Sequence, residues 1–260
     1  KDVTGGMKTK WGEHEIDWSH SNWRRMTMRE AIVHFWPKEA GNSPSLTEFA
    51  SVDGFARRLK DAAGLLQQAW SDQPDPTLGE EVRKIRAHFT VLRATFSHIA
   101  RELEASSNIG KAIAHLFEAI AEEHLMQPTI IYEFPTAVSP LSKQKPDEPD
   151  WTERFEMFAG QMEISNGFSE LNDPEDQRQR FEAQLKERER GDDEAHQMDE
   201  NYINALSYGM PPAGGVGLGV DRLAMLLTDS HTIRDVILFP QLRPEKHATA
   251  EGAESAESER

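Results

Sequence analysis

The glycine-rich stretch GGVGLGVDRLAML, residues 214–226, is the feature that most restricts the fold of this chain. Glycine recurs at every second or third position of its first half, so the backbone there can approach a ligand closely. From Asp221 onward the apolar spacing becomes helical, which predicts a strand that runs directly into a helix. Arg222 then lies beside the positive end of that helix. Such a corner suits an anion or a flat ring.

The same stretch does not fit the dinucleotide fingerprint GxGxxG. Reading from Gly215 gives GxGxG, and reading from Gly217 places Arg222 where the last glycine belongs. A Rossmann site is therefore excluded here. The sequence also contains no GxSxG nucleophile motif and no phosphate-binding P-loop.

Size and charge limit the classes of function. A chain of 260 residues can bury a substantial core, and we favour one domain with an insert. Its 45 Asp and Glu against 29 Lys and Arg give a net charge of −16. The surface as a whole therefore repels phosphate backbones, and nucleic acid could be held only by a local patch.

The composition also bears on the compartment. The chain has no cysteine, which excludes disulfides and thiolate metal sites and is typical of a reducing compartment. It has no run of about 18 apolar residues and no signal-peptide pattern, so we expect a soluble, cytoplasmic protein that does not bind a membrane. Because the first residue is Lys1 and not Met, we expect a piece of a longer chain.

Capping signals mark the first helices. Thr27 and Glu30 in MTMREAI form a capping box, which predicts a short helix over about residues 28–36 that stops at the following proline. Before it, EHEIDW alternates weakly, like an edge strand. A second box, Ser45 with Glu48 in SLTE, predicts the start of a longer helix.

Apolar residues then step by three and four along two segments, on either side of the breaker SDQPDPTLG. The first segment loosens at Gly64. We expect an antiparallel helical hairpin, an insert over residues 46–105. Two interpretations remain open: the seam serves only the mutual packing of the two helices, or the hairpin is an arm for docking or dimerisation.

The remaining pattern predicts an antiparallel sheet interrupted and flanked by helices, which is an α+β fold. Residues 154–171 should form two strands joined by a turn at Ala159 and Gly160. Further strands are expected at 129–135, at the glycine-rich stretch and at VILFPQ, and further helices at 109–125, 174–190 and 199–207. The domain should end at residue 244, and the acidic tail 245–260 should be disordered.

Two glutamates in this strand pair point to a metal. With a turn at Ala159 and Gly160, Glu156 faces Glu163 directly, and like charges there are destabilising unless a cation or a shared proton compensates. Magnesium fits, because it is usually held by one or two carboxylates together with substrate phosphates. The alternative is that both glutamates point to water on an exposed face.

Asn166, Phe168 and Glu170 alternate on one face, but strict period two places them opposite Glu163. A bulge at the turn-prone pair Asn166 and Gly167 would bring them to the same side. Glu170 then becomes an interior anion whose cationic partner could be a substrate ammonium group. Equally, it could be a capping carboxylate before the next helix. The histidines do not suggest a metal site, since His124, His196 and His231 lack metal-ligand spacing.

Three strings in this order closely resemble the C-terminal half of class II lysyl-tRNA synthetases: HLMQPTIIYEFPTAVSPLSK, RFEMFAGQMEISNGFSELNDPEDQ and GGVGLGVDRLAMLLTDSHTIRDVILFPQLRP. MTMREAI is similar too. The resemblance covers residues 26–37 and 108–244, and the stretch with Arg222 resembles the third class II motif. It implies a class II antiparallel sheet flanked by helices.

The resemblance also implies a role for each candidate residue. Arg222 would lie against the ATP adenine and near the γ-phosphate, over a floor formed by Gly217 and Gly219. The magnesium-binding glutamates would be Glu156 and Glu163, and the lysine pocket would be Asn166, Phe168 and Glu170, with Glu170 pairing with the lysine ammonium group. The implied reaction is ATP-dependent adenylation of lysine, followed by transfer to the terminal ribose of tRNA(Lys) by a homodimeric enzyme.

Several family features have no counterpart in the chain. These are the N-terminal anticodon-binding barrel and the first and second class II motifs, of which the second supplies an arginine to the α-phosphate. Ser165 stands where glycine is expected, and the hairpin is longer than usual. We therefore expect negligible activity from these residues alone. The alternatives are a non-catalytic paralogue that binds lysine or a partner, and a ligase that lysylates a protein, of the elongation factor P type.

Overall fold

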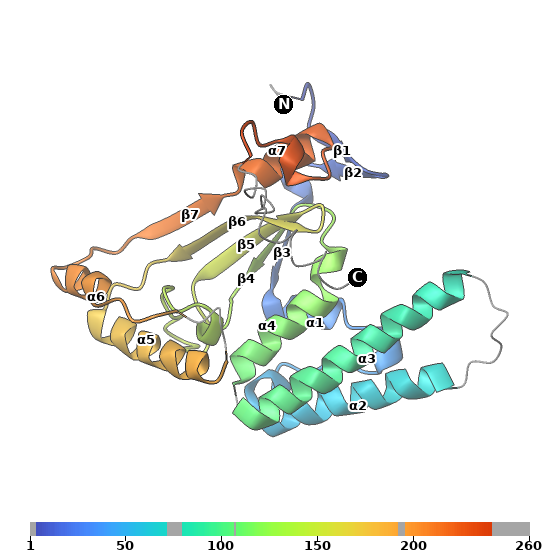
Figure 1. The fold of residues 1–260 in the computed structure, drawn as a ribbon, viewed down its shortest axis with the longest axis horizontal. Helices are drawn as coiled ribbons and strands as arrows, with labels where there is room; N and C mark the ends of the chain where they lie inside the picture. The colour runs from blue at the N-terminus through green and yellow to red at the C-terminus, as the bar shows by residue number, and fades with distance from the viewer. Residues whose placement is uncertain (1–3, 72–79, 107, 192–195, 241–260) are drawn as a thin grey trace, which may run out of the picture.

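The computed structural model describes residues 4–71, 80–106, 108–191 and 196–240. At its centre is a five-stranded sheet, shown in Figure 1 with helices on both faces. The strands lie in the order β3 (Arg24–Thr27), β4 (Thr129–Tyr132), β5 (Arg154–Ala159), β6 (Met162–Ser169) and β7 (Gly214–Leu218). The expected α+β class is confirmed.

One strand pair differs from the expected antiparallel pattern. β3 pairs with β4 in parallel, whereas the β4–β5, β5–β6 and β6–β7 pairs are antiparallel. Parallel neighbours need a crossover connection, and here the helices between residues 28 and 128 form it. The prediction missed β3 because RRMT is too short and too polar to show a strand period.

The first part of the chain forms a separate two-stranded sheet. β1 (Lys8–Trp11) pairs with β2 (His14–Asp17), so the strand expected within EHEIDW exists but does not join the main sheet. Trp11 and Ile16 pack against Leu226 of α7 (Val220–Thr228), on one face of the main sheet. The N-terminal hairpin therefore helps to fix the helix that carries Arg222.

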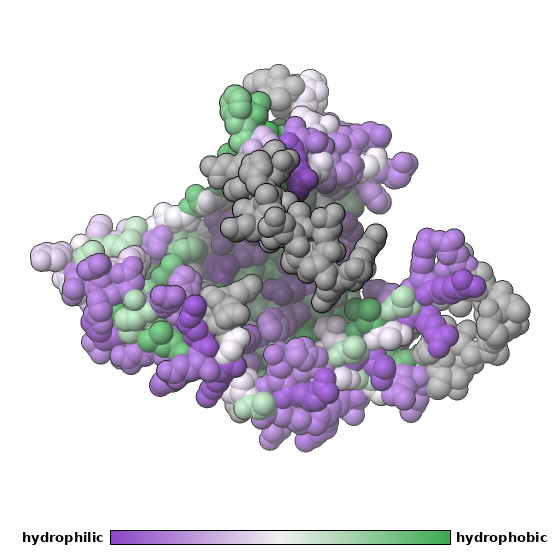
Figure 2. Space-filling view, in the orientation of Figure 1, coloured by the Kyte–Doolittle hydropathy of each residue, from purple (hydrophilic) through white to green (hydrophobic). Residues whose placement is uncertain are grey.

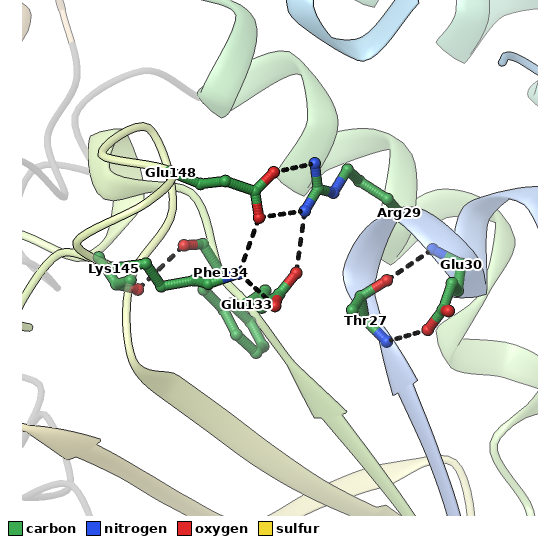
Figure 3. Close-up of polar contacts among 8 residues, drawn as sticks. Thr27, Arg29, Glu30, Glu133, Phe134, Lys145 and Glu148 are labelled. Atoms are coloured by element: carbon green, nitrogen blue, oxygen red, sulfur yellow. Dashed lines mark hydrogen bonds and ion pairs between the residues drawn. The ribbon is translucent and has the colours of Figure 1, made fainter. Parts of the chain in front are cut away.

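The two predicted capping boxes have different outcomes. Thr27 and Glu30 exchange both hydrogen bonds at the start of α1 (Met28–His34), as Figure 3 shows. Glu48 accepts hydrogen bonds from the backbone and hydroxyl of Ser45, but these hold a turn into the short 3₁₀ helix η3 (Glu48–Ala50). The long helix begins later, at Val52, so the second box was wrong as a helix start.

The expected helical hairpin is present. α2 (Val52–Ser71) and α3 (Glu80–Ser106) run antiparallel, with Lys60 paired to Glu104 and Arg93 within 3.5 Å of Gln67. α2 continues unbroken through Gly64, so the expected loosening was wrong. The seam joins the main core, where Phe96 stacks on Trp36 at 5.2 Å. This burial supports the interpretation that the seam serves the mutual packing of the two helices. It does not test whether the solvent-facing side of the hairpin is an arm for docking or dimerisation.

The remaining helices lie on the same side of the sheet as the hairpin and at one end of the sheet (Figure 1). α4 (Ile109–Ile120) ends earlier than expected and is followed by the 3₁₀ helix η4 (Glu122–His124). Its Phe117 packs edge to face on Phe158 of β5. α5 (Pro174–Glu189) and α6 (Glu200–Ser207) begin at Asp cap residues. The remaining short helices are η1 (His20–Asn22), η2 (Lys38–Ala40), η5 (Thr136–Val138) and η6 (Ile233–Asp235).

The strand predicted for VILFPQ was wrong. Residues 236–240 follow η6 as turns without strand pairing. Leu238 and Phe239 are almost fully exposed, so this apolar run does not pack into the core of the described part of the chain. The predicted tail, residues 245–260, lies outside the described residues.

Candidate functional site

The β5–β6 turn sets the geometry of the site. Gly160 and Gln161 both have positive φ, of 58° and 64°, and Ala159 pairs with Met162. Positive φ at both central residues is typical of a type I′ hairpin. A side chain at Gly160 would also meet Leu226 at 2.5 Å. The turn therefore lies one residue later than predicted.

This shift changes the partner of each glutamate. Glu163 faces Phe158, and Glu156 faces Asn166, so the predicted direct pairing of the two carboxylates was wrong. Ile164 has no partner in the register, which marks a bulge between the two pairs. Glu156 and Glu163 are instead diagonal neighbours on the two strands.

The bulge places the candidate residues on one face of the sheet. Because one extra residue is inserted after Glu163, the alternation is reset, and Glu163, Asn166 and Phe168 all lie on the face that carries Glu156. The expected bulge thus exists, but at Ile164 and not at Asn166 and Gly167. On the neighbouring strand β7, the residues opposite Asn166 and Phe168 are Gly217 and Gly215.

Glu156 is a buried carboxylate with a cationic partner. Arg154 Nη2 lies 2.6 Å from Glu156 Oε1, and both side chains are largely shielded from solvent. Burial raises the pKa of Glu156 to about 7, against the opposing charge of Arg154, and the charge of Glu163 adds to the increase. The guanidinium also reaches Asn166 Oδ1 at 3.3 Å and the carbonyl of Val138 at 2.9 Å. Arg154 therefore connects the carboxylate to Asn166 and to the loop before β5.

Sequence reasoning did not identify Arg154. The available signal was its position two residues before Glu156, because alternate residues of a strand share a face. Glu122 was missed as well, since it lies just beyond α4. Its pKa is raised first by burial and then by the charges of Glu118 and Glu163, which indicates that it faces the same acidic group.

Arg222 lies at the start of α7, as predicted. Its Nη1 donates to the backbone carbonyl of Glu163 at 2.6 Å and lies 3.3 Å from Glu163 Oε2. Gly219 is the cap residue of this helix, and its N–H donates to the carbonyl of Ile164 in the bulge. The glycine corner is thus fixed to the bulge on one side, while the Arg222 side chain stays about half exposed.

Glu170 continues the same face beyond the end of β6. An added Cβ at Gly215 would lie 2.9 Å from Glu170 Oε1, so the carboxylate rests directly on the glycine strand. Within the described residues this carboxylate has no hydrogen bond or ion pair. It does not cap the following helix, because Asp173 does so. A half-buried carboxylate without a partner is suited to a cationic ligand.

The candidate residues line two neighbouring hollows. The larger, of about 760 Å³, lies between the sheet, α4 and α5, and Arg154, Glu156 and Glu122 line it. The space-filling view in Figure 2 shows a recess with hydrophilic side chains at its centre. The smaller, of about 340 Å³, is lined by Glu163, Ser165, Asn166, Gly217, Gly219 and Arg222. Phe168 and Glu170 line neither, so the structure does not collect every predicted residue in one cavity.

An ion-pair network supports the loop beside the larger hollow (Figure 3). Arg29 binds Glu133 at 2.9 Å and Glu148 at 3.0 Å, and Lys145 bridges the same two carboxylates. Hydrogen bonds from Arg29 and Lys145 lower the pKa of Glu148 to about 2. Glu133 has φ of 61°, an uncommon conformation that these contacts hold. The Arg154 guanidinium lies over the ring of the adjacent Phe134, with its Cζ 4.7 Å from the centre of the ring.

The structure separates the histidines. His124 stacks on Phe35, His196 on Phe181, and His231 lies 4.2 Å from the ring of Trp11. Among the residues that the structure describes, no group of three or more His, Cys, Asp or Glu side chains could hold a metal ion. A magnesium ion held by two carboxylates and substrate phosphates needs fewer protein ligands, and Glu156 and Glu163 are carboxylates that neighbouring strands bring to one face.

Comparison with known proteins identifies the fold. A model of the family "tRNA synthetases class II (D, K and N)" matches residues 3–243. The chain belongs to this class II family. None of the helices in the described part of the chain is both long and apolar enough to cross a membrane.

Similar proteins in the class II family are lysine–tRNA ligases. The chain is 43% identical over 244 residues to one from Halalkalibacterium halodurans, covering 94% of this chain and 40% of that protein. It is 41% identical over 246 residues to the heat-inducible lysine–tRNA ligase of Escherichia coli strain K12, covering 95% and 40%. A ligase from Moorella thermoacetica is 58% identical over 154 residues, covering 59% and 31%. The chain thus spans about two fifths of the first two relatives.

Proposed function

We propose that this chain is the C-terminal part of the catalytic domain of a lysine–tRNA ligase. The observation that carries the proposal is the bulge at Ile164, which brings Glu156, Glu163 and Asn166 onto one face beside the glycine strand. In this proposal the domain extends over residues 1–244, with residues 46–105 as a helical insert. The relatives support the choice of lysine, since all three are named lysine–tRNA ligases.

Lysine recognition is assigned to Glu170, Asn166 and Phe168. The carboxylate of Glu170 has no partner among the described residues, so a lysine ammonium group would satisfy it with a charge-assisted hydrogen bond. Asn166 is already oriented by Arg154 at 3.3 Å and can present its amide to the substrate. Phe168 supplies an apolar surface for the aliphatic stem. A neutral analogue of lysine would leave Glu170 unpaired, which is the physical basis of selection.

ATP is assigned to the corner formed by Gly217, Gly219 and Arg222. Without side chains, the two glycines leave space for a flat ring, and the guanidinium can stack on it or neutralise phosphate. Arg222 already contacts Glu163 at 3.3 Å, so a nucleotide bound there would adjoin that carboxylate.

Glu156 and Glu163 would hold Mg²⁺ beside the ATP phosphates. When bound, the ion would neutralise phosphate charge as the lysine carboxylate attacks the α-phosphorus and pyrophosphate leaves. Arg154 keeps Glu156 in place before that, because its guanidinium donates to Oε1 and is itself held by Val138 and Asn166. Residues outside this chain would supply the arginine at the α-phosphate.

The proposal also covers the acceptor of the lysyl group and the oligomeric state of the enzyme. Transfer of the lysyl group would go to tRNA(Lys), in a cytoplasmic homodimer whose remaining parts lie outside these residues. The experiment is lysine-dependent exchange of pyrophosphate into ATP, measured on the 260-residue chain and on the complete product of the reading frame that contains it.

We expect robust exchange from the complete product, negligible exchange from the chain alone, and lysyl transfer to tRNA(Lys). Lack of lysine-dependent exchange in the complete product would contradict the ligase and favour a non-catalytic paralogue. Transfer to a protein and not to tRNA would instead favour the protein-lysylating alternative.

A further inference from the structure

The central part of α3 has a charge pattern opposite to that of the whole chain. Residues 83–101 of α3 contain five Lys and Arg and two His but none of the 45 Asp and Glu, in a protein of net charge −16. The hairpin projects away from the sheet in Figure 1, and Figure 2 shows hydrophilic side chains interspersed with apolar ones over it. This is the kind of local basic patch through which an acidic protein can still bind a polyanion.

The basic side chains lie on the solvent side of α3. At about 100° per residue, Arg83 and Arg101 fall on one line, and Arg86 and Arg93 lie within about a quarter turn of it. Arg83, Arg86 and Arg101 are exposed, and Arg93 is partly exposed. The buried side, which packs on α2, α4 and the main core, consists of Leu92, Phe96, Ile99 and Leu103. The stripe extends about 27 Å along the helix.

Contacts within the hairpin explain only part of this pattern, such as the hydrogen bond from Arg93 to Gln67 of α2 at 3.5 Å. Arg83 and Arg86 are three residues apart, and like charges at that spacing weaken a helix slightly. The ion pair from Lys84 to Glu80 is highly exposed, and pairs of that kind contribute little. The residues between the arginines on the outer side, Ala87, Thr90, Ala94 and Ser97, are small, so a partner could approach the guanidinium groups closely.

We propose that this outer face of α3 is a binding surface for an RNA backbone. The partner follows from charge complementarity together with the proposed function, on which this inference rests, because a tRNA ligase must hold a polyanion that the rest of the surface repels. Arginine fits phosphate better than lysine does, since its planar fork donates two parallel hydrogen bonds. Contacts to phosphates position an RNA without reading its sequence, so the surface serves a tRNA of any sequence.

The test measures binding of a fluorescein-labelled tRNA(Lys) transcript to the 260-residue chain by fluorescence anisotropy, between about 50 and 200 mM salt. One variant neutralises the stripe with the substitutions Arg83→Gln, Arg86→Gln, Arg93→Gln and Arg101→Gln. A control removes the same charge from exposed positions outside the hairpin, with Arg25→Gln, Lys38→Gln, Lys186→Gln and Arg234→Gln. A third variant replaces the four stripe arginines by lysine and keeps the charge.

We expect the stripe variant to bind at least tenfold more weakly than the control. Its slope of log affinity against log salt should be smaller by roughly 0.9 for each phosphate that the variant no longer neutralises. The lysine variant should retain most of the salt slope. An unrelated tRNA should bind as well as tRNA(Lys). Circular dichroism checks that the helices remain.

Equal binding by the stripe variant and the control would contradict the proposed RNA-binding surface. Absence of detectable binding by the unmodified chain would contradict it too. Competition by polyglutamate as strong as that by RNA would point to an acidic protein partner and would also overturn it. These results are independent of pyrophosphate exchange, which needs no RNA, so failure of this inference is distinguishable from failure of the proposed function.

Discussion

Substitution of Gly215 by alanine is a direct perturbation of the position assigned to lysine. The added Cβ would lie 2.9 Å from Glu170 Oε1, whereas ordinary contacts begin near 3.4 Å. The Glu170 carboxylate must therefore move by about 0.5 Å or more. Because that carboxylate is the end of a flexible side chain, we expect the displacement to alter the site without unfolding the sheet.

The size of the effect follows from the interaction that the substitution removes. A hydrogen bond to a charged group contributes about 1.5–3 kcal/mol, which corresponds to roughly 10- to 150-fold in affinity. In lysine-dependent pyrophosphate exchange by the complete reading-frame product, Gly215→Ala should raise the KM for lysine by about tenfold or more. The KM for ATP should change by less than about twofold, because Glu170 lies away from the nucleotide corner.

Gly217→Ala is the matched comparison on the same strand and the same face. Its added Cβ would meet only the carbonyl of Asn166, at an ordinary 3.7 Å, and would leave Glu170 undisturbed. The methyl group would instead narrow the floor assigned to adenine, so this variant should raise the KM for ATP more than that for lysine. Equal effects of the two variants on lysine would refute the reasoning, as would an unchanged lysine KM in Gly215→Ala.

Four further substitutions test the lysine site and other parts of the structure. Glu170→Gln in the complete product should impair lysine selection far more than ATP binding. Equal loss of both would contradict the assignment of Glu170 as the partner of the lysine ammonium group. Because the pKa of Glu148 is lowered from 4.5 to about 2, its stabilising effect is complete above pH 4.5 and disappears as the pH falls toward 2. Glu148→Gln should therefore lower the melting temperature near pH 7. The decline of the melting temperature between about pH 5 and 2 should be smaller in this variant, as thermal unfolding across pH can check. In the same assay, Gly64→Ala should raise stability by about 0.5–1 kcal/mol because its Cβ meets open space within α2, whereas Gly167→Ala should lower it by about 1–3 kcal/mol because its Cβ would lie 2.7 Å from the Phe155 ring.

Local signals in the sequence predicted the elements whose cause is local. The capping box of Thr27 and Glu30 requires only a few neighbouring residues, and the structure forms both of its hydrogen bonds. The apolar seams likewise predicted the hairpin. The Ser45 and Glu48 pair shows the limit of such signals, because only one of the two capping-box hydrogen bonds forms. Glu48 accepts from the Ser45 N–H, but its own N–H donates to the Ser45 carbonyl and not to the hydroxyl, which closes a 3₁₀ turn.

The register of the site could not be obtained in the same way. Whether the turn falls at Ala159 or one residue later depends on Leu226 and Trp11, which pack against Gly160 from distant parts of the chain. The bulge at Ile164 is a second change of register beyond that shift. Sequence reasoning identified the need for a bulge, because Glu163 and Asn166 otherwise face opposite ways, but the position needed the three-dimensional contacts.

Arg154 and β3 were missed for a related reason. The role of Arg154 is visible only when Glu156, Asn166 and Val138 converge on it from two strands and a loop. β3 is a four-residue strand with two arginines, so its apolar pattern is too weak to predict pairing. In both cases tertiary contacts, and not local propensity, determine the structure.

The most direct test of the central claim is a crystal structure of the complete reading-frame product with a non-hydrolysable lysyl-adenylate analogue. We predict that the lysine ammonium group contacts the Glu170 carboxylate, that Asn166 borders the same ligand, and that the adenine lies over Gly217 and Gly219 against Arg222. An analogue bound elsewhere, or bound with its ammonium group away from Glu170, would contradict the assignment of this face of the sheet as the lysine and ATP site.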